Sequence, residues 1–234
     1  MSACAPDAQG AEIRVGASAL MADPAGVLYW PDEGLLAVAD LHLEKGSAYA
    51  ARGILLPPYD TAATLARLAR LIMRYAPRVV VALGDSFHDG GGPARIAADD
   101  RESLTVLQRG REWFWIAGNH DPAPPAGVGG HFTQILCLRD LTFRHEPQQD
   151  PAENEIAGHL HPIACIVQRS RAVSRRCFAA DAKRIVMPAF GAYTGGLNVR
   201  HQAFAGLFKG RRFTAHMLGE QRLYAVPGSR CLPD

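Results

Sequence analysis

The sequence predicts an α/β protein built around a largely parallel sheet. In the first half of the chain, apolar β-prone runs alternate with stretches of helical periodicity, and beyond residue 131 short strands replace this pattern. A strand–helix–strand order places parallel strands side by side under covering helices. We therefore expect a sheet sandwiched by helices in the first half and a strand-rich second half.

The elements of the first half follow from its apolar runs and turn signals. The turn signal Pro-Asp-Glu-Gly at 31–34 joins two β-prone runs and predicts a hairpin that leads into the core. Apolar residues at helical spacing, bounded by Pro58 and Pro77, predict a helix, and the β-branched run after it indicates a strand buried on both faces. The expected strands are 27–30, 35–39, 79–83 and 113–117, and the expected helices are 59–75 and 94–109.

The second half is expected to consist mainly of short strands. A helix is expected at 198–208, and a terminal hairpin around Gly219-Glu220. No Ser-, Gly- or Pro-rich linker divides the chain, so residues 1–234 are expected to form a single domain. The expected strands are 133–136, 141–144, 155–157, 163–168, 184–187, 213–218 and 223–226.

The composition is that of a soluble globular protein, with 48% hydrophobic and 21% charged residues. No apolar run approaches the roughly 18 residues that span a membrane, and the N-terminus lacks a basic start with an apolar centre, so we expect a cytoplasmic protein without a membrane partner. The five cysteines are widely spaced and form no Cys-x-x-Cys motif, which indicates reduced, mostly buried thiols.

The charge is unevenly distributed although the net charge is only +2. Residues 1–164 contain 13 Lys and Arg against 20 Asp and Glu, a balance of −7, whereas residues 165–234 contain 12 against 3, a balance of +9. A basic C-terminal third is typical either of a solvated face or of a surface that binds a polyanion, and both interpretations stay open.

Polar loops with Asp, Asn or His follow five of the apolar strands. In an α/β sheet the loops beyond the carboxyl ends of the strands meet in one crevice, so these five loops are expected to converge. Residues i and i+2 on extended backbone point the same way, which would let Asp40 and His42 reach one ion together, and let His159 and His161 approach a shared centre. The loops contain Asp40-Leu-His42, Gly84-Asp85-Ser-Phe-His88-Asp89, Gly118-Asn119-His120-Asp121, Arg144-His145 and Gly158-His159-Leu-His161.

This ordered set of motifs resembles the calcineurin-like metallophosphoesterases over residues 35–161. The segment 187–198, together with the motifs at 40–46 and 84–89, also resembles a narrower group, the bacterial DNA-ligase-associated phosphoesterases. The resemblance implies a four-layer αββα sandwich of two mixed sheets flanked by helices, which agrees with the pattern of elements described above.

The resemblance also implies a centre of two divalent transition-metal ions, bridged by Asp85. Mixed imidazole, carboxylate and amide ligands suit Mn, Fe, Zn or Ni, and we expect Mn. Two such ions against two carboxylates leave a net charge of +2, which binds phosphate and lowers the pKa of a bridging water, so a metal-bound hydroxide is expected to attack phosphorus. The implied ligands are Asp40, His42, Asp85 and His161 for one ion, and Asp85, Asn119, His145 and His159 for the other.

Two of these assignments depend on detail in the motifs. His120 resembles the family's non-ligand histidine, which would stabilise the phosphoryl group or protonate the leaving oxygen, with Asp121 holding its tautomer. His145 precedes Glu146 where the family has glycine, so His131 is a rival ligand. The position of His145 directly after an expected strand favours His145.

Other side chains are candidates for substrate contact. His88 is an extra histidine that either touches substrate or orders its loop. Arg175 and Arg176 belong to a run of four arginines that lines either one face beside the site or a solvated strand edge. Trp113 and Trp115 alternate along an expected strand, where core packing explains them better than base stacking.

The leading functional hypothesis is a metal-dependent phosphodiesterase or nuclease that acts on DNA in repair, with DNA ligase and helicase proteins as possible associates. The same metal pair would serve an enzyme that cleaves a small nucleotide, because fold does not fix the substrate. A non-catalytic scaffold in a repair complex is a third hypothesis. The complete ligand set and His120 argue against the scaffold.

Overall fold

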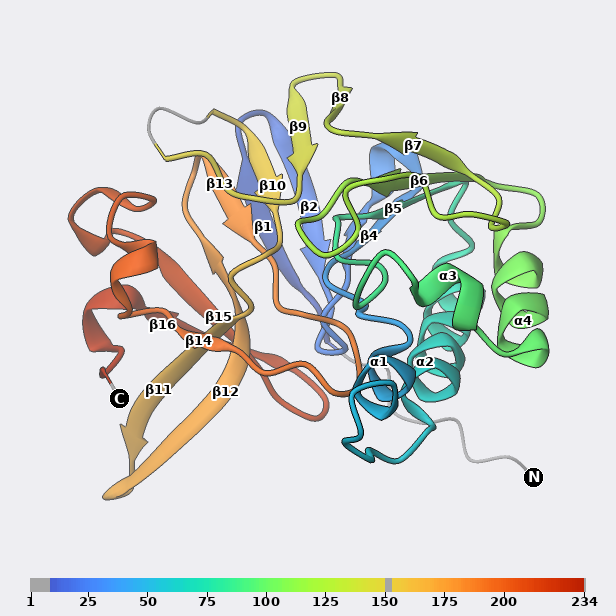
Figure 1. Ribbon diagram of the computed structural model, residues 1–234. Coiled ribbons are helices and arrows are strands. Elements are labelled where there is room, and N and C mark those ends of the chain that lie inside the picture. The colour runs from blue at the N-terminus through green and yellow to red at the C-terminus, as the bar shows by residue number, and fades with distance from the viewer. Residues whose placement is uncertain (1–8, 150–152, 234) are drawn as a thin grey trace, which may run out of the picture.

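The computed structural model describes residues 9–149 and 153–233, which form two packed sheets with helices on one side (Figure 1). The first sheet has the strand order β1-β2-β3-β4-β5-β6-β7. Its first four strands pair antiparallel, and β4 to β7 pair parallel, as the alternation of strands and helices predicted. The strands are β1 (Ala11–Val15), β2 (Ser18–Ala22), β3 (Leu28–Trp30), β4 (Leu35–Val38), β5 (Val79–Ala82), β6 (Glu112–Ile116) and β7 (His131–Thr133).

The second sheet has the order β14-β11-β12-β13-β10-β9-β8, and β15 and β16 extend it from β12. Strand β10 runs parallel to both β9 and β13, whereas β12 pairs antiparallel with β11, β13 and β15, so this sheet is mixed too. The strands are β8 (Leu136–Leu138), β9 (Leu141–Arg144), β10 (Glu155–Ala157), β11 (Pro162–Gln168), β12 (Arg171–Ala180), β13 (Arg184–Val186), β14 (Leu197–Asn198), β15 (Thr214–Leu218) and β16 (Leu223–Pro227).

Three apolar cores hold four layers together. The helices α1 (Lys45–Ala50), α2 (Asp60–Tyr75), α3 (Gly92–Arg95) and α4 (Ala98–Gln108) lie on the first sheet, and α2 and α4 bury their apolar faces against it. Trp113 and Trp115 lie in this core, 1% and 2% exposed, which confirms the packing role expected for them. A second core fills the space between the sheets, and Phe204, Phe208 and Phe213 cover the outer face of the second sheet.

The two-sheet sandwich is confirmed, but its outer layer over the second sheet consists of short 3-10 turns. The helix expected at 198–208 is wrong, because only Gln202–Phe204 forms a 3-10 turn there. The apolar residues of this segment, Phe204, Leu207 and Phe208, pack on the sheet from turns. Within the described residues this layer contains no α-helix.

Other expected elements differ in their boundaries. The helix predicted at 94–109 is interrupted at Ile96, whose extended ψ of 129° separates α3 from α4. The strand predicted at 133–136 is two strands, because the chain leaves the first sheet after Thr133 and enters the second at Leu136. The sequence did not indicate β1, β2, α1 or the full length of β12.

The cysteines agree only in part with expectation. Cys177 and Cys231 are buried, Cys165 is half-buried and Cys137 is exposed, and all four are free thiols. Cys4 lies outside the described residues. No helix in the ranges 9–149 and 153–233 combines the length and apolar character needed to cross a membrane.

Candidate metal centre

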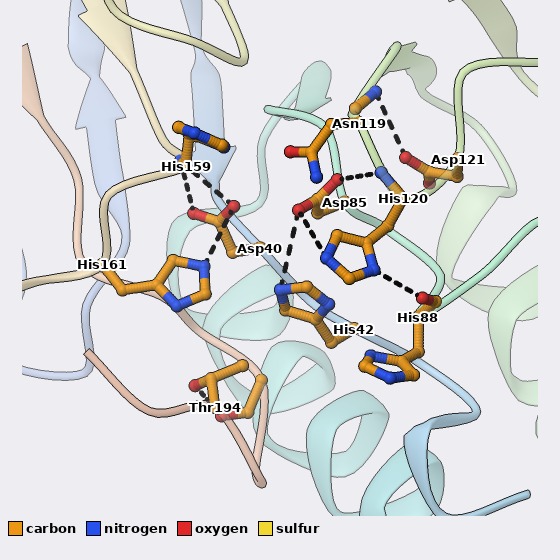
Figure 2. A network of polar contacts seen from close by, with 12 residues as sticks. Asp40, His42, Asp85, His88, Asn119, His120, Asp121, His159, His161 and Thr194 are labelled. Atoms are coloured by element: carbon orange, nitrogen blue, oxygen red, sulfur yellow. Dashed lines mark hydrogen bonds and ion pairs between the residues drawn. The ribbon is translucent and has the colours of Figure 1, made fainter. Parts of the chain in front are cut away.

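The predicted ligands converge at one end of the sandwich, where strands of both sheets end (Figure 2). The first sheet contributes the loops after β4, β5 and β6, and the second sheet contributes those after β9 and β10. Because β4, β5 and β6 are parallel neighbours, their carboxyl ends lie side by side. The residues on these five loops are Asp40 and His42, Asp85 and His88, Asn119 to Asp121, His145, and His159 and His161.

The side chains form three groups whose ligand atoms all lie within 4.8 Å of one another. Two of them fall within the two predicted ligand sets: Asp40, His42 and His161 in one cluster, and Asp85, His145 and His159 in the other. The third group joins His42 to His88 and His120. Asp85 lies between the two clusters. Its Oδ2 is 3.8 Å from His42 Nε2 in the first cluster, and its Oδ1 is 3.4 Å from His145 Nε2 in the second.

The backbone that positions these ligands is not extended, which corrects the geometry expected from the i, i+2 spacing. Asp40, His42, Asp85, His159 and His161 all have positive φ, between 44° and 68°. Such left-handed conformations cost about 1–3 kcal/mol each and occur where the surrounding structure imposes them. Each strand therefore ends just before its ligands, and tight turns aim the side chains inward.

Hydrogen bonds between the loops impose these turns. The amide of His42 donates to the Asp85 carbonyl (2.9 Å), which joins the loops after β4 and β5. The amide of His159 donates to both carboxylate oxygens of Asp40 (3.1 Å each), and that of His120 donates to Asp85 Oδ1 (2.9 Å). The two carboxylates thus anchor loops of both sheets while keeping lone pairs in the centre.

Two glycines allow the loops to approach each other. Gly84 has φ +73°, and a Cβ there would lie 2.5 Å from the His145 ring. At Gly118 a Cβ would lie 2.1 Å from the Asp85 backbone nitrogen. Glycine permits this close approach because it has no Cβ, and the approaching groups are the candidate ligands themselves.

His145 is held for ligation through Nε2. Its Nδ1 lies 2.9 Å from the Leu83 carbonyl, and its Nε2 faces Asn119 Oδ1 (2.9 Å) and His159 Nδ1 (3.1 Å). A carbonyl at Nδ1 fixes ring orientation and leaves Nε2 for a metal. The rival His131 begins β7, where it is exposed and packs beside Phe114. The structure therefore brings His145, and not His131, into the second cluster.

The charges of the centre suit divalent cations. Burial alone lowers the pKa of His145, but the hydrogen bond and charge of Asp85 and the charge of Asp40 raise it to about 9. Burial raises the pKa of Asp85, yet contact with His145 and the amide of His120 lowers it to about 2. The buried carboxylates thus favour positive charge at this position, which a bound metal ion would supply.

The first cluster also fits a cation. Burial lowers the pKa of His42 to about 4, which outweighs the charges of Asp40 and Asp85 and keeps the ring in the neutral form that binds metals. His42 Nδ1 is buried and has no hydrogen-bond partner, and His161 Nε2 lies 3.3 Å from Asp40 Oδ1. Taken over both clusters, the imidazole nitrogens, the two carboxylates and the amide of Asn119 make a donor set suited to first-row transition metals.

His120 and Asp121 do not interact as predicted. His120 Nδ1 contacts the His88 carbonyl (2.7 Å), so His88 and not Asp121 holds the tautomer (Figure 2). The Asp121 carboxylate accepts hydrogen bonds from the amides of Ser86 (2.8 Å), Phe87 (3.0 Å) and Gly118 (3.2 Å). Asp121 therefore positions the loops after β5 and β6, because three converging amides compete better for it than one imidazole.

The substrate residues expected from the sequence separate into two groups. The His88 ring lies beside those of His42 (5.6 Å) and His120 (5.2 Å), within the site.

Arg175 and Arg176 are consecutive on β12 and face opposite sides, as alternation in a strand requires. Of the two interpretations of the arginine run, a single face beside the site therefore does not hold for this pair. Arg175 faces a groove of about 950 Å³ next to β15 and β16.

Arg176 instead supports the loop after β13, which borders the site. Its guanidinium donates to the carbonyls of Ala189 (3.0 Å), Gly191 (3.4 Å) and Thr194 (2.7 Å). On the same loop, the amide of Gly191 donates to the Asp40 carbonyl (3.1 Å). Sequence analysis singled out this segment only as part of a resemblance. A basic residue in a strand gives no signal that its partners are loop carbonyls.

Arg67 on α2 is a second support that sequence analysis missed. It donates to the Phe190 carbonyl and lies over the Phe190 ring, 3.8 Å from its centroid. Burial, with the charges of Arg176 and Arg70, lowers the pKa of Arg67 to about 10, which leaves it charged at neutral pH. Helical periodicity gives no sign of this role, because the expected pattern for Arg67 is simply a polar position on an amphipathic helix.

Two packed mixed sheets with histidine, aspartate and asparagine on the loops at one end define the class of the metallophosphoesterases. The chain belongs to the calcineurin-like phosphoesterase family, whose model matches residues 35–190. A nuclease MPE from Pseudomonas putida has a similar structure, with a TM-score of 0.73 and 26% sequence identity over 93% of this chain and 100% of the other. Yfce, a phosphoesterase from E. coli, gives a TM-score of 0.43 and 17% identity over 82% of this chain and 98% of the other. Among curated proteins, no sequence matches this chain.

Proposed function

We propose that this chain is a two-metal phosphodiesterase that cleaves nucleic acid, with DNA as its substrate and a place in DNA repair. The observation that carries the proposal is the pair of ligand clusters joined by Asp85. Similarity to the Pseudomonas putida nuclease over the whole length of that protein supports the choice of nucleic acid. Cytoplasmic location and association with ligase and helicase proteins, both expected from the sequence, belong to the same proposal.

The residues that would hold the metals are those of the two clusters, with Mn as the proposed metal. When bound, the two ions supply positive charge that binds a phosphate and lowers the pKa of a water molecule. Loop hydrogen bonds and glycine contacts within the chain itself hold the carboxylates and His145 in place. We assign Asp40, His42, Asp85 and His161 to one ion and Asp85, Asn119, His145 and His159 to the other.

His120 is the proposed acid. Its side chain is 38% exposed, and its Nδ1 donates to the His88 carbonyl, so Nε2 points into the open site 3.9 Å from Asp85 Oδ2. A proton at Nε2 can pass to the leaving oxygen or stabilise charge on the phosphoryl group. Asp121 acts through the backbone by holding the loops that carry Asp85 and Asn119.

One observation favours the alternative of a small nucleotide substrate. A pocket of about 290 Å³ borders the second cluster, lined by Asn119 and His145 together with Ile135 and Arg144. A single nucleotide bound in this pocket would have one cation, Arg144, and one apolar side chain, Ile135, beside its scissile phosphate. Longer nucleic acid would in addition need contacts outside this pocket.

Salt dependence of binding separates these two substrates. With His120→Ala to suppress cleavage and Mn²⁺ present, we expect a labelled single-stranded oligonucleotide to bind with log K falling by about 0.7 per log unit of salt for each phosphate contacted, or about 2.8 for four phosphates. A mononucleotide should give a much shallower slope. Robust hydrolysis of small nucleotides without oligonucleotide binding at low salt would refute the nuclease proposal and support the alternative.

A further inference from the structure

A groove of about 950 Å³ opens between two hairpins of the second sheet, on the face of β12 that carries Arg175. Residues 171–176 of β12 pair with β11, whereas residues 177–180 pair with β15, so the β11–β12 and β15–β16 hairpins separate at this point. In Figure 1 the tip of the β11–β12 hairpin stands clear of the rest of the chain. The two hairpins form the walls of the groove, and their paired strands fix its shape.

The groove is separate from the metal centre, although it begins near it. β11 starts directly after the candidate ligand His161; Arg175 pairs with the residue three positions beyond His161, and Arg171 with the residue seven positions beyond it. At about 3.3 Å per residue, Arg175 therefore lies roughly 10 Å along the strand from His161, and Arg171 roughly 23 Å. Because Arg176 supports the loop beside the site from the other face of β12, the groove is not a wall of the metal centre.

Positive charge predominates in the groove. Alternation along β12 puts Arg171 and Arg175 on the groove face, and Arg222 lines the opposite wall from the loop between β15 and β16. Glu220 is the only acidic side chain among the described residues that line the groove. The segment 162–180, which contains the whole β11–β12 hairpin, has four arginines and no Asp or Glu. The groove therefore attracts anions.

The spacing of these cations suits a chain of phosphates better than a single phosphate. Arg171 and Arg175 are four residues apart on one face of β12, which separates them by about 13 Å. Side chains stand roughly perpendicular to a strand, so the two guanidinium groups keep this separation and meet different phosphates along a backbone. A polymer with regularly spaced phosphates is thus a better partner than one nucleotide.

An aromatic ring lies among the cations. Tyr224, which is 49% exposed, lines the groove, and the Arg222 guanidinium lies over its ring, 4.9 Å from the centroid. Cations that alternate with an aromatic ring are typical of nucleic-acid binding, because phosphates pair with the cations and bases stack on the ring. An acidic peptide would use the cations alone, so the ring favours nucleic acid.

The groups that line the groove are held on well-defined backbone. The β11–β12 hairpin closes through a two-residue turn in which Arg169 and Ser170 both have positive φ, 49° and 63°, the conformation that matches the twist of paired strands. On the opposite wall the amide of Gly219 donates to the Arg222 carbonyl (3.0 Å). Little ordering of the backbone is therefore needed when a ligand binds, which favours affinity.

We propose that this distal groove, formed by Arg171, Arg175, Arg222 and Tyr224, is a second binding surface for nucleic acid. It holds the backbone of a substrate outside the segment at the metal centre. The inference rests on the proposed nuclease function and adds a surface that the cleavage chemistry itself does not require. With stacked nucleotides about 3.4 Å apart, the distance of roughly 23 Å to Arg171 corresponds to about seven nucleotides, so only longer substrates reach the whole groove.

The salt dependence of binding in charge-matched variants tests the distal groove. Arg171→Ala with Arg222→Ala removes two of its cations, and Arg14→Ala with Arg109→Ala removes two exposed arginines elsewhere as the control. Each pair is combined with His120→Ala, and binding of a labelled single-stranded 20-mer and of a 4-mer is measured with Mn²⁺ over a tenfold range of salt. For the 20-mer, we expect the slope of log K against log salt to become shallower by about 1.4 in the groove variant, or about 25-fold over that range. The slope should stay within about 0.3 in the control, and the 4-mer slope should stay unchanged in both variants.

The outcomes distinguish the inference from the proposed function. An unchanged 20-mer slope in the groove variant overturns the distal groove, as does an equal change in the control or an equal change with the 4-mer. If the wild-type enzyme still cleaves DNA in that case, the nuclease proposal stands and the groove serves another occupant, such as an acidic segment of a protein. Hydrolysis of bis(p-nitrophenyl) phosphate with neither cleavage nor binding of DNA overturns the proposed function and the inference with it.

A covalent probe gives an independent readout of the same contact. Irradiation of an oligonucleotide that contains 5-iododeoxyuridine links the base to adjacent aromatic side chains, and mass spectrometry locates the adduct. With His120→Ala to preserve the strand, we expect the 20-mer to form adducts at Tyr224 and the 4-mer to form none there. Adducts of the 20-mer confined to the surroundings of the metal centre, such as Tyr49, whose ring lies 5.6 Å from that of His88, would overturn the inference.

Discussion

Gly84→Ala tests whether close packing against His145 assembles the metal centre. Gly84 has φ +73°, and an added Cβ would lie 2.5 Å from the His145 ring, about 1 Å closer than an ordinary carbon contact. The ring cannot retreat easily, because its side chain is 4% exposed and Nδ1 is bonded to the Leu83 carbonyl. The loop that carries Asp85 must therefore move relative to His145.

Gly110→Ala supplies the matched control. Gly110 has nearly the same φ, +72°, with nothing within 4 Å of an added Cβ. Both variants bear the left-handed strain of about 1–2 kcal/mol, and only Gly84→Ala adds overpacking of about 1–3 kcal/mol. At about 2–4 °C per kcal/mol, we expect Tm to fall by roughly 2–8 °C in Gly110→Ala and roughly 4–20 °C in Gly84→Ala.

Activity separates the two variants more sharply than stability does. A displacement of about 1 Å at a reacting centre costs about 10²-fold in rate, so Gly84→Ala should lose about that factor in kcat/KM for bis(p-nitrophenyl) phosphate. Gly110→Ala should retain wild-type kcat/KM below its Tm. Elemental analysis of both proteins should show metal loss only in Gly84→Ala. Equal activity and metal content in the two variants would refute the reasoning.

Three further predictions address the assigned roles. Asp85→Asn should lose most of both metals, because it removes the shared ligand and one negative charge; stoichiometric metal in this variant would contradict the bridging assignment. His120→Ala should keep its metals while hydrolysis of an activated diester falls about 10²- to 10⁴-fold, and metal loss alongside rate would make His120 a ligand. Arg176→Ala should lower Tm by roughly 5–15 °C, since three loop carbonyls lose their donor, whereas Arg175→Ala should leave Tm within about 2 °C and lower the salt slope of oligonucleotide binding by about 0.7. Equal Tm values for these neighbouring arginine variants would contradict their placement on opposite faces.

The sequence alone indicated the class of fold and the membership of the site. Apolar runs separated by helical stretches indicated the parallel strands β4, β5 and β6, because strands buried between layers consist of continuous apolar segments. The polar residues that follow these strands were therefore expected to lie together at the carboxyl end of the sheet. The order of these motifs gave the resemblance to a known family, and that resemblance implied the members of both ligand clusters.

Local patterns failed where several residues compete for the same partner. Nothing in the order Asn119-His120-Asp121 reveals that Asp121 turns to three amides while His120 turns to a carbonyl of another loop. The helix expected at 198–208 failed for a related reason, because the sheet surface accepts apolar side chains equally well from turns. Such choices depend on long-range contacts that no window of sequence contains.

Tertiary structure also decided the direction of each functional side chain. Positive φ at Asp40, His42 and Asp85 is imposed by hydrogen bonds between loops that are distant in sequence, and intrinsic preference would disfavour it. The period of two in β12 sends Arg176 to the loop beside Asp40 and Arg175 to the opposite groove. The sequence thus indicates which residues belong to the site, whereas packing decides which way their side chains point. Each left-handed turn is stable only when the neighbouring loops hold it.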